Sequence, residues 1–299
     1  MATIDLLKST VLFGTLKICL AKFSKKLRKS KHITLEAISK DVISTSQLSR
    51  WENGLSDISL NKLIILLNRI NVSPQEFIAM TIPKNNETNN FLKNLSLLYS
   101  EKDSISIYRI FLKNIAAYHH TNNVDYLFHA SAAANVLFDI KNKNYLTPQD
   151  QQDLKLFLTQ NNHWNLSTIQ AFGNSGFILP NNTVFQLINS LIEDIVYLEN
   201  INFEFYLEAW NTIINNSLIL VKTDFKKSKL LLARIKELSY TEPYLSITVK
   251  VNFLELLIHY REDGNSEPIK RFLESAKVLG IPNLYNDLLF GWALLKLNS

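Results

Sequence analysis

The sequence predicts an all-α protein of two domains. Only seven glycines and seven prolines occur in 299 residues, and no segment bounded by them alternates apolar and polar positions as a half-buried strand does. Apolar residues recur instead at helical spacing in one segment after another. Because 299 residues exceed what one core usually holds, a small domain followed by a larger one is expected.

The positive charge is concentrated near the N-terminus. Residues 1–80 contain 12 Lys and Arg and 6 Asp and Glu, a net charge of +6, whereas the whole chain has a net charge of +5. The rest of the chain therefore has a net charge of −1. A basic domain ahead of a nearly neutral one indicates a polyanionic partner for the first domain and another ligand for the second.

Five short helices are expected within residues 17–80, after an N-terminal extension of residues 1–16. Leu20, Phe23 and Leu27 share one face of the first helix, whose other face is basic. Residues that can cap or open later helices follow at short intervals: Thr34, Ser59, and Ser73 with proline at the first helical position. Five helices in about 60 residues form a compact bundle.

The stretch "TIPKNNETNN" at residues 81–90 breaks the helical pattern and is the expected linker. Eleven helical segments follow within residues 91–299, in pairs of roughly 35–45 residues, which favours a TPR-like array of stacked α-hairpins. The strict tetratricopeptide consensus is absent, so the repeat is degenerate. An irregular helical domain is the alternative.

Residues 44–54, "STSQLSRWENG", predict the turn and second helix of a helix-turn-helix. Burial of Leu48 and Trp51 against Leu35, Ile38 and the fourth helix directs the polar side chains outward. In a major groove, arginine can bind guanine while serine, threonine and glutamine bind base edges or phosphates. The expected DNA-contacting residues are Thr45, Ser46, Gln47, Ser49 and Arg50, with Lys25, Lys29 and Lys31 on phosphates. A merely polar surface helix is the alternative.

The end of this stretch has a structural role. Asn53 and Gly54 are expected to terminate the helix, because glycine tolerates the left-handed conformation. Glu52 stands one residue before the end, where the helix dipole disfavours an acid. We therefore expect Glu52 to pair with a basic residue of the same domain.

Residues 27–77 resemble the Cro/C1-type (XRE) helix-turn-helix, and in particular the Rgg/MutR transcriptional regulators. The family form S-x-S-Q-[IL]-S-R-[FW]-E-x-G matches the stretch that begins at Ser44 and ends at Gly54. The similarity continues more weakly through the helical repeats and a Gly173–Asn174 step. It implies a repeat domain that forms a homodimer and, in several members, binds a short re-imported peptide.

Two features depart from this family. About 16 residues precede the usual start, so they are either a genuine extension or the result of a mis-assigned initiation site. Members that sense an acidic peptide often have an arginine a few residues after the Gly–Asn step, where this chain has Phe177. An apolar peptide, or no peptide, is therefore as consistent with the resemblance as an acidic one.

Two asparagines are expected to hold the backbone of such a peptide beside Phe177. Asn216 and Asn252 stand in the middle of helical segments, where asparagine has poor propensity. The amide can donate to and accept from a peptide backbone whatever the peptide's side chains are. Solvation, or a hydrogen bond to a buried neighbour, would explain these asparagines equally well.

Enzymatic and metal-dependent functions lack support. The chain has no glycine-rich phosphate loop, no GxSxG and no HExxH, and Cys19 is its only cysteine. No cofactor, metal site or stable membrane insertion is expected, and a reducing cytoplasm is the expected location. The expected function is a sequence-specific DNA-binding regulator under peptide control. The alternative is a helical-repeat adaptor whose small domain binds protein.

Overall fold

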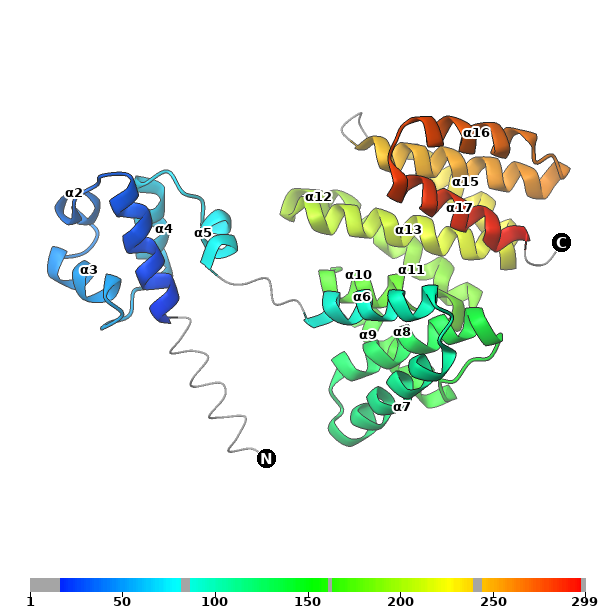
Figure 1. The fold of residues 1–299 in the computed structure, drawn as a ribbon, viewed down its shortest axis with the longest axis horizontal. Helices are drawn as coiled ribbons and strands as arrows, with labels where there is room; N and C mark the ends of the chain where they lie inside the picture. Colours follow the sequence, from blue (N-terminus) through cyan, green and yellow to red (C-terminus); the bar gives the residue numbers. More distant parts are fainter. Residues whose placement is uncertain (1–16, 82–86, 161–162, 239–243, 297–299) are drawn as a thin grey trace. The chain divides into compact units, whose positions relative to one another are not determined.

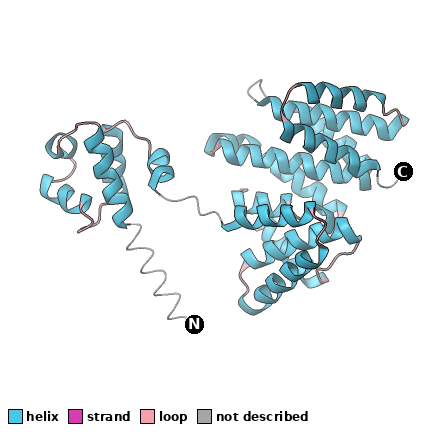
Figure 2. Ribbon diagram, in the orientation of Figure 1, coloured by secondary structure: helices cyan, strands magenta, loops and turns pink. Residues whose placement is uncertain are grey.

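The structure is a computed structural model that describes residues 17–81, 87–160, 163–238 and 244–296. Every regular element in the described ranges is helical, which agrees with the predicted all-α class (Figure 2). The chain divides into two compact units, residues 1–87 and 88–299. In the described ranges, no helix is both long enough and apolar enough to span a membrane.

The first unit contains the five expected helices (Figure 1). A helix covering residues 17–30 is followed by α2 (Leu35–Ser39), α3 (Thr45–Glu52), α4 (Leu60–Arg69) and α5 (Pro74–Thr81). Thr34 caps α2 and Ser59 caps α4, as predicted, by accepting the amides of Ala37 and Lys62. Local cap chemistry therefore determines where these short helices begin.

The core of the first unit forms where the apolar faces of these helices meet. Leu48 and Trp51 of α3 are only 1% and 3% exposed and pack with Ile38 of α2 and Leu66 of α4. Leu35 joins the same cluster from its edge. The predicted burial of the third helix is confirmed, and this burial sets which residues of α3 face outward.

The second unit is an array of packed helices. The first half comprises α6 (Glu87–Ser100), α7 (Ser104–Thr121), α8 (Val124–Lys141), α9 (Pro148–Thr159), α10 (Leu166–Gly173), the 3-10 helix η1 (Gly176–Ile178) and α11 (Asn181–Glu193). The second half comprises α12 (Ile195–Ile201), α13 (Phe203–Thr223), α14 (Phe225–Glu237), α15 (Leu245–Asp263), α16 (Glu267–Val278) and α17 (Pro282–Lys296).

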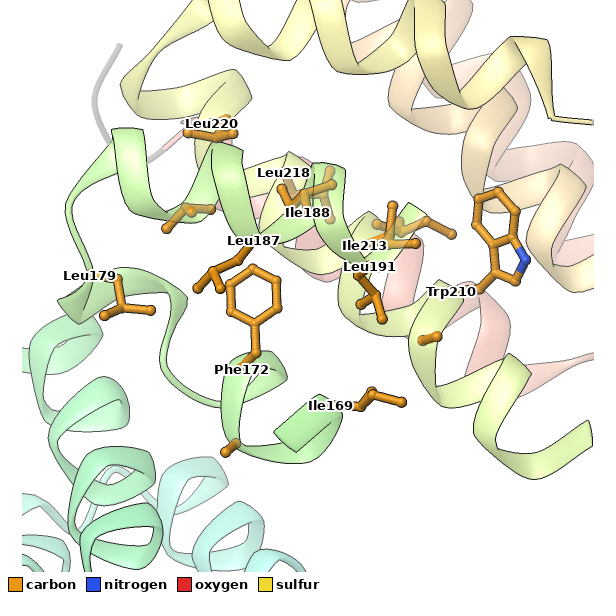
Figure 3. Close-up of a cluster of buried hydrophobic side chains, with 14 of the residues drawn as sticks. Ile169, Phe172, Leu179, Leu187, Ile188, Leu191, Trp210, Ile213, Leu218 and Leu220 are labelled. Atoms are coloured by element: carbon orange, nitrogen blue, oxygen red, sulfur yellow. The ribbon is translucent and has the colours of Figure 1, made fainter. Parts of the chain in front are cut away.

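Two neighbouring helices, α10 and α11, lie in the middle of this unit. The helix α10 contacts α8, α9 and α13, and α11 contacts α9, α12, α13 and α14. Figure 3 shows the apolar core between them, where Phe172 of α10 lies close to Leu187 of α11. The helix α13 contacts α10, α11, α12, α14, α15 and α17, so it is the central element of the unit.

Three boundaries differ from the predicted pattern. The helix α6 begins at Glu87, so the last residues of the predicted linker are helical. The segment around Gly173 divides into α10 and η1, and the long segment after it divides into α11 and α12 at Asp194. The carboxylate of Asp194 accepts the backbone N–H of Trp164 at 2.8 Å, a distant interaction that no local pattern encodes.

Candidate nucleic-acid interface and ligand surface

The outward face of α3 presents short polar side chains and one arginine. The N-cap Ser44 accepts the amide of Gln47 at 3.2 Å, which starts the helix. Four of the predicted DNA-contacting residues are exposed and the fifth, Ser49, is half-buried: the set is Thr45, Ser46, Gln47, Ser49 and Arg50. Because Leu48 and Trp51 lie on the buried face, this polar face is free to approach a nucleic acid.

The end of α3 is stabilised as predicted. Gly54 has a φ of +77°, a left-handed conformation that a side chain would strain, and its N–H donates to the Trp51 carbonyl at 2.7 Å. Asn53 adds a second link, since its side-chain N–H donates to the Ser49 carbonyl at 2.9 Å. The helix therefore stops at a defined point before the loop to α4.

A buried ion pair joins α3 to the first helix. Nε and Nη2 of Arg28 donate to the two carboxylate oxygens of Glu52 at 2.7 Å each, and Nη1 donates to the Ile33 carbonyl at 2.7 Å. The side chains are 7% and 2% exposed. The hydrogen bond to Glu52 raises the pKa of Arg28, although burial opposes it. The predicted pairing of Glu52 is confirmed, and Arg28 is the partner that sequence analysis did not identify.

The three predicted phosphate-contacting lysines differ in their surroundings. Lys29 is exposed and makes no hydrogen bond or ion pair with any described residue. Nζ of Lys25 donates to Oδ1 of Asn53 at 2.6 Å. Nζ of Lys31 donates to the carbonyls of Ile70 and Asn71 at the end of α4. Of the three, Lys31 thus has a structural role that its sequence context did not indicate.

Phe177 lies on η1, between α8 and α13. It is half-buried, its N–H donates to Oδ1 of Asn135 at 2.8 Å, and its ring is stacked 6.4 Å from that of Phe138. The neighbouring Gly176 lies so close to α13 that a Cβ on it would come 2.0 Å from Oδ1 of Asn216. Glycine is therefore required for η1 to pack against α13.

Asn216 is buried in this contact rather than exposed. It is 1% exposed, and its amide donates to the Thr212 carbonyl at 3.0 Å. The adjacent Asn215 is exposed, and it shares a face of α13 with Asn211, four residues earlier. The structure thus places Asn216 in a packing role, and the outward asparagine that the sequence could not distinguish is Asn215.

Asn252 is exposed on α15 but lies on a different face from Lys250, which contacts α13. Nζ of Lys250 donates to Oδ1 of Asn211 at 3.0 Å. At about 100° per residue, Asn252 is roughly 200° around the helix from Lys250. The structure therefore brings Phe177 and Asn216 together through Gly176, and it leaves Asn252 apart from them. Their shared role in peptide binding stays a prediction.

The described residues form no group of three or more His, Cys, Asp and Glu side chains that could hold a metal ion.

The fold and the outward face of α3 together define a helix-turn-helix DNA-binding protein with an attached helical-repeat domain. A helix-turn-helix family profile matches residues 25–77, and the profile of the HTH-type transcriptional regulator Rgg, C-terminal domain, matches residues 112–288. Since the second match covers more than half of the chain, the protein belongs to the Rgg family of transcriptional regulators.

Solved structures of similar fold cover nearly the whole chain. The Streptococcus dysgalactiae SHP pheromone receptor Rgg2 has a TM-score of 0.70 and 21% identity, over 92% of this chain and 98% of that chain. A PrgX/cCF10 complex has a TM-score of 0.66 and 14% identity, over 93% and 100%. These likenesses confirm the predicted fold. No curated protein sequence matches the chain significantly.

Proposed function

We propose that this Rgg-family regulator binds a two-fold symmetric DNA operator as a homodimer, and that a short peptide bound by the repeat unit controls it in the cytoplasm. The DNA-binding proposal rests on the outward face of α3. This face presents Arg50 and four uncharged polar residues, and the acidic residue of the helix, Glu52, is buried. Such a face suits the electronegative major groove. The peptide proposal rests on the resemblance to PrgX, which is solved with cCF10, and to Rgg2, described as a pheromone receptor.

The DNA-binding proposal is tested by selecting sequences from a random duplex library with the full chain. A single helix-turn-helix reads only a few base pairs, so the selected site should contain two inverted half-sites roughly 34 Å apart or a multiple of that. Arg50→Ala should lose preference at one base pair of each half-site. A selected pool without any preferred sequence would contradict the proposal.

A homodimer is supported by apolar side chains left exposed near the C-terminal end. Val278 is 87% exposed, and four further large apolar residues of this region are more than a third exposed: Leu279, Ile281, Leu289 and Phe290. Large apolar side chains left exposed in one region often belong to a protein–protein contact. We assign the dimer contact to this group of residues on and between α16 and α17.

Sedimentation velocity of the full chain tests the dimer. Phe290→Asp should shift the protein toward the monomer at micromolar concentration, because a charge would be buried in an apolar contact. Leu230→Asp on α14, which is also exposed, should leave the oligomeric state unchanged. A monomeric wild-type protein, or equal effects of both substitutions, would contradict the assignment.

The peptide surface is proposed around Phe177 and the exposed asparagine face of α13. Asn215 is available for hydrogen bonds to a peptide backbone, and Phe177 offers part of an aromatic ring to an apolar peptide side chain. Asn216 would act indirectly, by holding η1 against α13 through Gly176. Asn252 lies outside this surface.

Calorimetry with apolar peptides encoded next to the gene tests the surface. Asn215→Ala should weaken binding by about fivefold, the value of roughly one net hydrogen bond, and Phe177→Ala should weaken it further. Asn252→Ala is the matched control and should bind normally. Equal affinities of the wild type, Asn215→Ala and Phe177→Ala would remove these residues from the site.

A further inference from the structure

A pocket of about 210 Å³ lies between α9, the start of α10 and α11. Its walls consist of Lys155, Leu158 and Thr159 from α9, then His163, Trp164 and Thr168, and finally Thr183, Gln186, Leu187 and Ser190 from one face of α11. These α11 residues are spaced as neighbours on one side of a helix. The pocket is lined by α9, α11 and the start of α10, whereas Phe177 is not among its lining residues and lies on η1, which contacts α8 and α13. It is therefore a separate site.

The lining is rich in hydrogen-bond donors. The ammonium group of Lys155 is exposed and has no partner among the described residues. Thr183 is only 7% exposed, and its hydroxyl makes no hydrogen bond within the described ranges. The hydroxyl of Ser190 accepts the indole N–H of Trp164 at 3.2 Å, which leaves its own hydrogen free to donate. The Thr183 oxygen is not among the fully buried polar atoms without a partner, so it keeps access to water, and an acceptor in the pocket would replace that water.

None of the described residues that line the pocket is acidic. The carboxylate of Asp194 contacts two of the lining residues, and each of its oxygens takes part in one hydrogen bond. One lies 3.2 Å from Nδ1 of His163, and the other accepts the N–H of Trp164. The ring of His163 is further held by stacking on Tyr197, with centroids 4.4 Å apart. With Nδ1–H donating to Asp194, Nε2 of a neutral His163 ring is an acceptor, so His163 is not counted among the donors of the pocket.

We propose that this pocket binds a small oxyanion, either a phosphate or a short organic carboxylate. Lys155 provides the positive charge at the rim, and Thr183, Ser190 and Gln186 provide neutral donors. Acceptors that carry a charge form stronger hydrogen bonds with such donors than neutral acceptors do. The volume is several times the roughly 30 Å³ that one water takes up in the liquid, so the pocket has room for a small anion rather than for a single water. Leu158 and Leu187 provide an apolar wall that a short hydrocarbon segment of the ligand can contact.

The test uses the full chain with inorganic phosphate and with succinate, each titrated at constant ionic strength set by chloride. Trp164 is one of four tryptophans, so its indole N–H signal can be followed by NMR after assignment with Trp164→Phe. Because this N–H donates to Ser190 in the pocket wall, its chemical shift should move as the site fills. The uncharged diol of the same chain length as succinate is the ligand control.

Lys155→Gln and Thr183→Val should each weaken binding, by on the order of tenfold for the charged lysine. Lys113→Gln, an exposed lysine of α7, is the matched control and should leave the affinity unchanged. Saturation by phosphate alone or by succinate alone would identify the source of the oxyanion. The proposal is overturned by a diol that binds as well as succinate, by unchanged affinity in Lys155→Gln, or by no saturation with either anion. Since Lys155 is exposed, that variant is informative even if Thr183→Val unfolds.

Discussion

The buried pair between Arg28 and Glu52 should be a main determinant of the stability of the first unit. Glu52→Leu removes the carboxylate and leaves a guanidinium that is 7% exposed without its counter-charge. Arginine cannot relieve this by losing its proton, because the guanidinium stays protonated in proteins. Breaking one member of a buried pair costs about 3–5 kcal/mol.

This cost is large compared with the stability available. At 0.05–0.15 kcal/mol per residue, residues 17–80 have a free energy of unfolding of about 3–10 kcal/mol. Glu52→Leu should therefore leave the first unit marginally folded or unfolded, while the second unit keeps its structure. Adding Arg28→Met should recover much of the loss, because buried ion pairs are often replaceable by apolar residues of similar volume.

Hydrogen exchange followed by mass spectrometry of the full chain measures both units at once. A loss of 3–5 kcal/mol should accelerate amide exchange in α2, α3 and α4 by about a hundredfold to a few thousandfold, without a change in α13. Asp57→Asn is the matched control, because Asp57 is 83% exposed and pairs with Lys17 on the surface. That substitution should change exchange by less than about fivefold. Acceleration below tenfold in Glu52→Leu, or a double variant no better than the single one, would refute the reasoning.

Three other outcomes are expected. Arg50→Ala should cost roughly 1–3 kcal/mol of binding free energy at one base position, as measured by anisotropy against single-base operator variants, and should leave thermal unfolding unchanged. Unchanged preference at every position would show that Arg50 reads no base. Lys29→Gln should reduce the slope of log DNA affinity against log salt concentration by about one. Lys31→Gln should mainly lower the melting temperature of the first unit. A reversal of the two effects would contradict the hydrogen bonds of Lys31 at the end of α4. Burial and the charge of Glu204 raise the pKa of Glu208, against an opposing effect of Lys250. The folded state therefore binds the Glu208 proton more tightly than the unfolded state does, so the stability of the second unit should fall as pH rises from the unfolded pKa through the raised folded pKa. Glu208→Gln should flatten this part of a profile of unfolding free energy against pH. A profile identical to that of the wild type would exclude Glu208 as the cause.

Local chemistry explains why much of the first unit could be predicted. Thr34 and Ser59 cap helices through amides three residues away, and Gly54 ends α3 through its own backbone conformation. These interactions lie within a few residues of one another, so they can be read from the order of residues. The spacing of Leu48 and Trp51 then determines which side of α3 is buried and which side can meet DNA.

The predicted ligand residues were less certain because their roles depend on distant neighbours. Asn215 and Asn216 are identical in type and adjacent, yet one is exposed and the other is 1% exposed. The difference arises from Gly176, forty residues earlier, whose lack of a side chain lets η1 approach α13. The phase of a long helix that is apolar on several sides cannot be determined from its own pattern.

The sequence by itself therefore determined the helical class, the helix-turn-helix, the start and end of α3 and the polarity of its outward face, because each depends on short-range hydrogen bonds or on helical periodicity. Only the tertiary structure decided that Arg28 is the partner of Glu52 and that Lys31 binds the end of α4. It also decided that Asp194, which divides one predicted helical segment into α11 and α12, binds Trp164, and that a donor-rich pocket forms beside α11. Each of these joins residues more than twenty positions apart. Such pairs become neighbours only when helices pack, and the packing is set by the whole core rather than by any one segment.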